Sequence, residues 1–187
     1  MDSTSHVNSH YNTWYWLKQS TGEVKDFNCG SWSCQRCSPG IAYRWALTVV
    51  KAAPQRMITL TNIPSDRQEA TLAYSTLVQD IRRQGWSFDY ARFLEAGKKT
   101  GMLHWHLAQI GDFLPQRWLS AHARKAGLGE VADIRACTNE GPAFYVAKYI
   151  TKDAAPAGWR KVSLSRGFPR PEKISSQGDW ILMQDNR

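Results

Sequence analysis

The chain has 187 residues, of which 42% are hydrophobic, and it carries a formal net charge of +8 at pH 7. This composition indicates a soluble globular protein rather than a membrane-spanning one, because the longest apolar run, IAYRWALTVV, is interrupted by Arg44. The N-terminus has no basic start followed by an apolar core, so it does not predict a signal peptide. The positive charge favours a polyanionic partner, with nucleic acid as the first candidate.

Composition and motifs divide the chain into four segments. Residues 1–20 are expected to form a flexible polar leader. Residues 21–53 contain three closely spaced cysteines that suggest a zinc-binding segment. Residues 54–152 are expected to form the folded core, and residues 153–187 a basic C-terminal extension.

The second segment contains Cys29, Cys34 and Cys37 within the nine residues of CGSWSCQRC. Without an export signal these thiols should stay reduced, which favours metal binding over disulfides. Three cysteines at this spacing predict a structural zinc site that needs one more ligand. Free thiols are the alternative, and the candidates for the fourth ligand are His6, His10, His122 and Cys137.

The core segment predicts six elements in the order strand, helix, strand, strand, helix, strand. Alternating residues predict the strands, and apolar residues at three- to four-residue spacing predict the helices, which end at Gly85 and Gly127. This order is typical of the α+β class with a ferredoxin-like or RRM-like split βαβ fold, an antiparallel sheet with helices on one face. The other face would then be available for a ligand or catalytic site. The strands are expected at residues 56–62, 87–96, 102–110 and 130–136.

Two histidines lie on the third predicted strand. In LHWHL, His104 and His106 are two residues apart, so both side chains point to the same face of the sheet, whereas Trp105 points to the core. Two neighbouring imidazoles on an open face are candidate ligands for a metal ion. Two partly exposed surface histidines are the alternative.

Glu95 is the candidate third ligand. A turn of four residues, Gly97 to Thr100, would pair Glu95 with Met102 and place its carboxylate diagonally beside His104. Two imidazoles and a carboxylate with open positions suit a divalent cation, Mg²⁺ or Mn²⁺, that also holds substrate oxygens. A salt bridge to a lysine of the turn is the alternative role for Glu95.

A helix at the end of the core carries two tyrosines and two lysines. In YVAKYITK, Tyr145, Lys148, Tyr149 and Lys152 fall at i, i+3, i+4 and i+7, which places all four on one helical face. The apolar residues lie on the opposite face, where they can pack on the core. A surface helix with half-exposed tyrosines is the alternative.

The basic extension directly follows this helix and is expected to contact a DNA backbone. A solvated tail is the alternative. The residues expected to make these contacts are Arg160, Lys161, Arg166 and Arg170.

TLT in the first strand, H-x-H on a central strand and Y-x-x-K on a later helix together resemble the HUH endonucleases of rolling-circle replication. The doubled tyrosine, and the segment VSLSRGFP after it, are most similar to the replication initiators of microvirus-type single-stranded DNA phages. The resemblance covers residues 56–152. No single motif is specific, but their order is.

This resemblance implies a metal-dependent enzyme that nicks and rejoins a single DNA strand at a replication origin. Tyr145 or Tyr149 would become joined to the 5′ phosphate and leave a free 3′ hydroxyl, while Lys148 and Lys152 neutralise phosphate charge. Whether one tyrosine or both attack stays open. The implied partners are single-stranded origin DNA, a host or phage helicase and a polymerase, and the implied location is the cytoplasm of a bacterial host, with the protein encoded by a phage. His104, His106 and Glu95 would hold the metal ion.

A non-catalytic module that binds single-stranded nucleic acid is the main alternative, because split βαβ sheets with basic tails also bind RNA and DNA. An HUH transposase or relaxase is a second alternative. A phosphohydrolase with an H-x-H-x-H triad is disfavoured, because Ala108 stands where the third histidine would be.

Overall fold

The computed structural model describes residues 14–26, 29–97, 100–129, 132–137, 155–171 and 179–184. The chain divides into two compact units, one formed by residues 1–41 with 172–187 and the other by residues 42–171. The predicted tyrosine helix, with Tyr145 and Tyr149, lies outside the described residues.

The first unit contains a three-stranded antiparallel sheet in the order β2-β1-β8. Its strands are β1 (Trp14–Lys18), β2 (Val24–Asp26) and β8 (Trp180–Gln184). Strand β1 lies within the segment that the sequence suggested to be a flexible leader. The pairing of β1 with β8 brings the two ends of the described chain together in one sheet, and the hydroxyl of Ser20 hydrogen-bonds Asp179 Oδ1 at 3.1 Å beside it.

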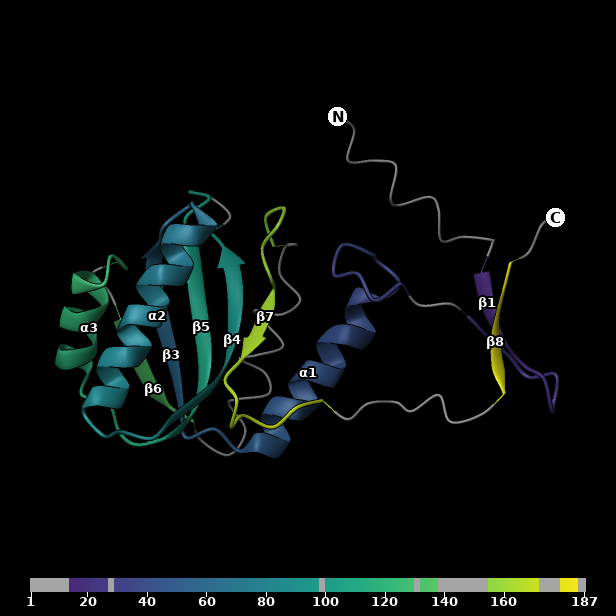
Figure 1. Cartoon of the computed structure of the whole chain (residues 1–187), viewed down its shortest axis with the longest axis horizontal. Helices are drawn as coiled ribbons and strands as arrows, with labels where there is room; N and C mark the ends of the chain where they lie inside the picture. The colour runs from purple at the N-terminus through teal and green to yellow at the C-terminus, as the bar shows by residue number, and fades with distance from the viewer. Residues whose placement is uncertain are drawn as a thin grey trace. The chain divides into compact units, whose positions relative to one another are not determined.

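The second unit contains a five-stranded antiparallel sheet in the order β6-β3-β5-β4-β7, seen in Figure 1. Its first four strands in sequence have the order and antiparallel pairing of a split βαβ fold, so the α+β fold prediction is confirmed. The added strand β7 pairs with β4 at one edge. The strands are β3 (Arg56–Ile63), β4 (Phe88–Ala96), β5 (Leu103–Gly111), β6 (Ala132–Ala136) and β7 (Val162–Leu164).

Two helices cover one face of this sheet: α2 (Arg67–Arg83) and α3 (Gln116–Lys125). Asp66 caps α2, because its Oδ1 accepts hydrogen bonds from the amides of Gln68 and Glu69 at 2.8 and 2.9 Å. Alternate strand residues face these helices, and together with the helices they form the main core. That core includes Leu60, Tyr74, Leu77, Ile81, Leu94, Trp105, Leu107, Leu119 and Ala132.

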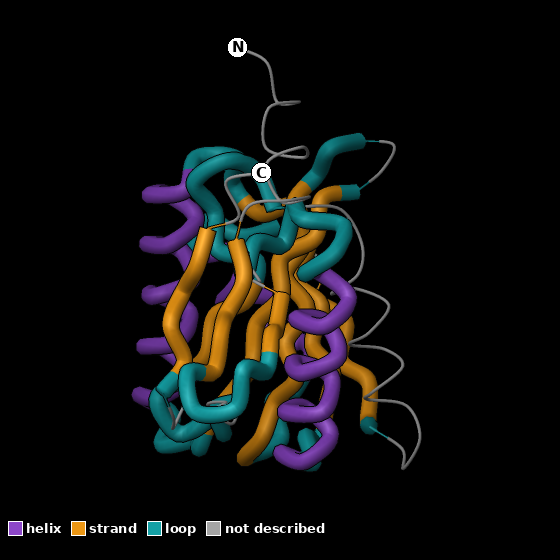
Figure 2. Tube along the Cα trace, turned by 90° about the vertical axis from the view of Figure 1, so that its right-hand side faces the viewer, coloured by secondary structure: helices purple, strands orange, loops and turns teal. Residues whose placement is uncertain are grey.

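Helix α1 (Ser38–Ala52) was not predicted from the sequence. Within the second unit its Trp45 ring makes a T-shaped contact with Phe93 of β4, with ring centroids 6.5 Å apart. Phe93 is fully buried and points away from Leu94, which belongs to the core under α2. Residues 42–52 of α1 therefore lie on the opposite face of the sheet from α2, and Figure 2 shows helices on both sides of the strands.

Within the described parts of the chain, no helix combines the length and the apolarity needed to cross a membrane.

Candidate active site

The three predicted metal ligands lie on one face of the five-stranded sheet. His104 and His106 alternate with Trp105 on β5, and Glu95 lies directly opposite His104 on the neighbouring strand β4. Trp105 packs into the core under α2, so the two histidines and the carboxylate occupy the other face. The sequence predicted that these three side chains lie on the same face of the sheet, and the structure has them there.

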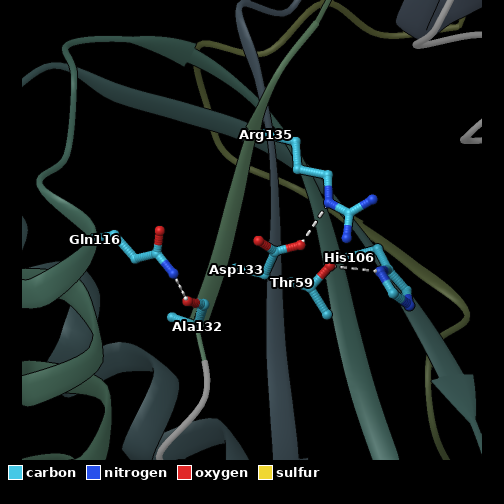
Figure 3. A network of polar contacts seen from close by, with 6 residues as sticks. All are labelled: Thr59, His106, Gln116, Ala132, Asp133 and Arg135. Carbon is cyan, nitrogen blue, oxygen red and sulfur yellow. Dashed lines mark hydrogen bonds and ion pairs between the residues drawn. The ribbon is translucent and has the colours of Figure 1, made fainter.

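Glu95 and His106 are in direct contact. His106 Nε2 lies 2.7 Å from Glu95 Oε2, and their side chains are only 6% and 11% exposed. On its other side, His106 Nδ1 lies 3.1 Å from the hydroxyl oxygen of Thr59 on β3. Figure 3 marks this contact with a dashed line. Both ring nitrogens of His106 therefore have a polar partner, which fixes the orientation of the imidazole.

The pairing register of this hairpin differs from the predicted one. A four-residue turn would have paired Glu95 with Met102, whereas Glu95 pairs with His104 and Ala96 with Leu103. The connection between the strands is thus two residues longer than expected, at residues 97–102. Because side chains alternate with a period of two, a shift of two residues leaves Glu95 on its predicted face.

His104 stands beside this pair and is less buried than His106. The two imidazole centroids are 6.5 Å apart, and the rings are tilted by 31°. Gly97 lies against His104, since a Cβ atom added there would be 3.4 Å from His104 Nε2. Among the described residues, the donor atoms of Glu95, His104 and His106 are not all within 4.8 Å of one another. To share one ion, the His104 ring would have to turn toward the other two side chains.

Thr59 and its surroundings were missed as site residues by sequence reasoning. Thr59 belongs to the TLT stretch and pairs with His106 on one side and with Asp133 of β6 on the other. Asp133 is 38% exposed and forms an ion pair with Arg135 at 2.7 Å (Figure 3). Alternation places Thr59 on one face of β3, but its neighbours depend on pairing across 47 residues, which the sequence does not reveal.

Three of the four predicted DNA contacts in the basic extension are exposed: Arg160, Arg166 and Arg170. Lys161 is the exception, because it is only 4% exposed and is too buried to contact a DNA backbone. Its carbonyl accepts a hydrogen bond from the Leu94 amide at 2.9 Å, so this part of the extension is docked on the sheet. The predicted catalytic residues Tyr145, Lys148, Tyr149 and Lys152 lie outside the described residues.

The first unit holds the cysteine cluster. The sulfur atoms of Cys29, Cys34 and Cys37 all lie within 4.8 Å of one another, so the cluster could bind a metal ion such as zinc. The sulfurs of Cys29 and Cys37 are 3.7 Å apart. A tetrahedral zinc site with Zn–S bonds of about 2.3 Å separates its sulfurs by about 3.8 Å, so the observed spacing fits that ion.

Two of the thiols differ in their local electrostatics. A hydrogen bond from the Cys37 backbone amide lowers the pKa of Cys34, whereas desolvation raises the pKa of Cys29. Two of the candidates for the fourth ligand, His122 and Cys137, belong to the second unit. His122 Nδ1 donates a hydrogen bond to the Trp118 carbonyl at 2.9 Å, which leaves only Nε2 for a metal. The other two, His6 and His10, lie outside the described residues.

Replacing Cys34 with serine is expected to reduce the zinc content of the purified protein from about one equivalent to a small fraction of that, because a hydroxyl is a poor zinc ligand. Elemental analysis of protein expressed with zinc measures this directly. Gln35→Ala, an exposed neighbour of the cluster, is the matched control and should keep its zinc. Equal zinc content in both variants would show that Cys34 is not a ligand, and no zinc in the wild type would show that the cysteines are free thiols.

Residues 55–154 match the family described as replication-associated protein ORF2. This range covers more than half of the 187 residues and contains β3 to β6, with the predicted ligands Glu95, His104 and His106. Comparison with curated proteins and with solved structures gives no significant match.

Proposed function

Because this chain belongs to the family of replication-associated protein ORF2, we propose that it initiates DNA replication by nicking and rejoining one strand at an origin. The proposed chemistry is that of the HUH endonucleases, with a covalent tyrosine–DNA intermediate. The observation that carries this proposal is the 2.7 Å contact between His106 and Glu95 on the face that also holds His104. An imidazole pair beside a mostly buried carboxylate is not needed for simple binding of DNA.

The donor set fits a divalent cation. Glu95 offers carboxylate oxygens, and His104 and His106 each offer an imidazole nitrogen from the same sheet face. The close approach of Glu95 Oε2 to His106 Nε2 places two of the three donors side by side. When bound there, Mg²⁺ or Mn²⁺ would polarise the scissile phosphate and favour attack at phosphorus.

Thr59 allows His106 to act as a ligand. An ionised Glu95 can only accept a hydrogen bond. A neutral His106 that faces it therefore carries its proton on Nε2, and its Nδ1 accepts a hydrogen bond from the Thr59 hydroxyl. For Nε2 to become a ligand, its proton must leave and Nδ1 must become the protonated nitrogen. A hydroxyl can donate or accept, so Thr59 can hold the imidazole in the same orientation in both states.

The nucleophile is proposed to be Tyr145 or Tyr149. The tyrosine oxygen forms a bond to phosphorus as the bond from phosphorus to the 3′ oxygen breaks, giving a 5′ phosphotyrosine and a 3′ hydroxyl. The phenol loses its proton to solvent or a nearby base, and the departing 3′ oxygen gains one. Lys148 and Lys152, on the same predicted helical face, would offset the charge that develops on the phosphate.

The doubled tyrosine provides a route to rejoining. After one round of synthesis, the second tyrosine could attack the regenerated origin junction while the freed 3′ hydroxyl attacks the first phosphotyrosine linkage. In the helix that the sequence predicts, the four-residue spacing would put both phenols on one side, about 6 Å apart along the axis. Two cleavages at one metal site are therefore compatible with this spacing.

Mutation of the tyrosines tests the proposal. Wild type, Tyr145→Phe, Tyr149→Phe and the double variant are incubated with labelled single-stranded origin oligonucleotides and Mn²⁺ or Mg²⁺, with EDTA as control. We expect a cation-dependent covalent adduct on the 5′ side of the cut, retained in either single variant and lost in the double variant. Denaturing gels resolve adduct, cut strand and intact strand.

The other outcomes are equally informative. Loss of the adduct in Tyr145→Phe alone would indicate a single nucleophile. Tyr90→Phe is the matched control, because Tyr90 lies on the α2 face of β4 and is outside the proposed site. Tight binding of single strands without any adduct, for every origin tested, would contradict the proposal and favour a non-catalytic binding module.

A further inference from the structure

A cavity of about 680 Å³ opens on the α2 side of the five-stranded sheet. Its floor is formed by strand residues, one wall by the first turns of α2, and the opposite wall by the segment that leads into β7. Pockets of a few hundred Å³ are the size range of small-ligand sites in proteins. The lining residues are Arg67, Gln68, Thr71, Leu72, Ser75, Arg92, Trp105, Gly158, Trp159, Arg160 and Ser163.

The lining combines positive charge with aromatic surface. Among the residues that the structure describes, the lining contains three arginines and no acidic residue, so it favours an anionic ligand. The half-buried Trp159 adds aromatic surface, whereas Trp105 is only 3% exposed, and hydroxyls and one amide add hydrogen-bonding groups. Guanidinium groups suit phosphate oxygens, and tryptophan rings suit the face of a nucleobase.

Arg92 lies at the floor of this cavity with unused hydrogen-bonding capacity. Its guanidinium carbon is 4.0 Å from the ring centre of Tyr74 and 4.1 Å from that of Trp105, so cation–π contacts hold it in place. Its Nη1 atom is fully buried and, among the described residues, has no hydrogen-bond partner. A buried unpaired donor is costly, and a shift of the guanidinium that brings Nη1 to an acceptor in the cavity would remove that cost.

Arg67 connects the two walls. It is the first residue of α2, and its Nη1 donates a hydrogen bond to the carbonyl of Gly158 at 3.0 Å. This contact fixes the turn that presents Trp159, whose ring packs against the main core. Arg160, the next residue, is exposed at the cavity. The site is therefore preorganised by contacts that are independent of a ligand.

We propose that this cavity binds one nucleotide, with its phosphate held by the arginines and its base against the accessible part of Trp159. Its biological context rests on the proposed function, in which the partner is a single DNA strand. Arg92 and Trp105 point to the opposite face from Glu95 and His104, because they alternate with them along β4 and β5. The cavity would thus hold a nucleotide that is not the one being cleaved.

Blocking the cavity without changing its charge tests this proposal. In the full chain, Ser75→Trp places a large ring at the wall, and Gln79→Trp, an exposed position on the same helix outside the cavity, is its control. Dissociation constants are measured by anisotropy for a labelled single-stranded 20-mer and by calorimetry for dAMP, dATP and inorganic phosphate. We expect Ser75→Trp to raise the dissociation constant of the nucleotide about tenfold, because this is the effect of losing one stacked base. Gln79→Trp should leave the dissociation constant unchanged.

A charge variant provides an independent arm. Arg160→Gln is expected to weaken binding of the 20-mer and to lower the slope of log K against log salt by about one, whereas Arg117→Gln, an exposed arginine on α3, should change neither. If Ser75→Trp weakens the binding of dAMP or dATP, the ligand of the cavity is a free nucleotide. An effect confined to the 20-mer identifies a nucleotide of the strand.

The two proposals fail separately. If the wild type forms the covalent adduct and Ser75→Trp binds every probe as the wild type does, the cavity proposal is wrong and the nicking proposal stands. If no protein forms an adduct but Ser75→Trp still weakens nucleotide binding, the nicking proposal fails and the cavity proposal stands. Circular dichroism confirms that each variant is folded before binding is measured.

Discussion

Replacing Glu95 with glutamine is expected to slow cation-dependent adduct formation by about 100-fold at a fixed Mn²⁺ concentration. The amide has the shape of the carboxylate but no negative charge, so it is a weaker ligand for a hard cation. It also faces His106 Nε2 at the position where Glu95 Oε2 now lies 2.7 Å away. The rate of adduct formation, measured across a Mn²⁺ titration, should show a higher cation requirement as well as a lower maximum.

Two further variants make this result specific. Glu69→Gln removes the same charge from an exposed position on α2 and should leave the rate unchanged. Thr59→Val removes the hydroxyl beside His106 Nδ1 and should give a smaller loss of rate, because it disturbs the orientation of a ligand and leaves the ligand itself in place. Cleavage by Glu95→Gln at the wild-type rate would remove Glu95 from the proposed site.

Replacing Gly167 with alanine is expected to destabilise the second unit by about 1–3 kcal/mol, through overpacking and disturbance of the hydrogen bonds to the half-buried Asp89. A Cβ atom at Gly167 would overlap the carboxylate of Asp89. That carboxylate accepts hydrogen bonds from the Ser165 hydroxyl at 2.7 Å and from the Gly167 amide at 3.2 Å. The neighbouring Phe168 is 2% exposed, so displacement of this segment would also expose an aromatic ring.

Urea unfolding monitored by tryptophan fluorescence measures this loss. Gly40→Ala controls for the change from glycine to alanine itself: it lies at the end of α1 that belongs to the first unit, with no atom within 4 Å of the added Cβ, and should be neutral or slightly stabilising. Equal midpoints for the two variants would show that the Asp89 contact contributes little. A loss confined to Gly167→Ala would establish that the VSLSRGFP segment is an integral part of the sheet.

The strands of the second unit could be predicted because their signals are local. Alternation along β5 placed His104 and His106 on one face, and the same rule placed Glu95 there despite the wrong turn length. The register was not predictable from composition, since a turn of four or six residues fits the same alternation. One residue more or less would have put Glu95 in the core, so the site depended on the parity of the turn.

The parts that could not be predicted depend on contacts between distant segments. Helix α1 contains an apolar run, but its packing partner Phe93 lies far away in the sequence, on strand β4. The position of Arg92 between Tyr74 and Trp105 requires a helix and two strands to meet. Such contacts follow from the tertiary arrangement, which residue spacing does not encode.

The short strand β7 has a consequence for how the sheet behaves toward other molecules. It pairs with β4 through Ala91, Arg92 and Phe93, and it lies beyond residue 154, where the family match ends. Removal of everything after that residue would expose the backbone donors and acceptors of β4 along an unprotected edge. Such edges recruit strands from other chains, so three residues outside the matched region help to protect this sheet against aggregation.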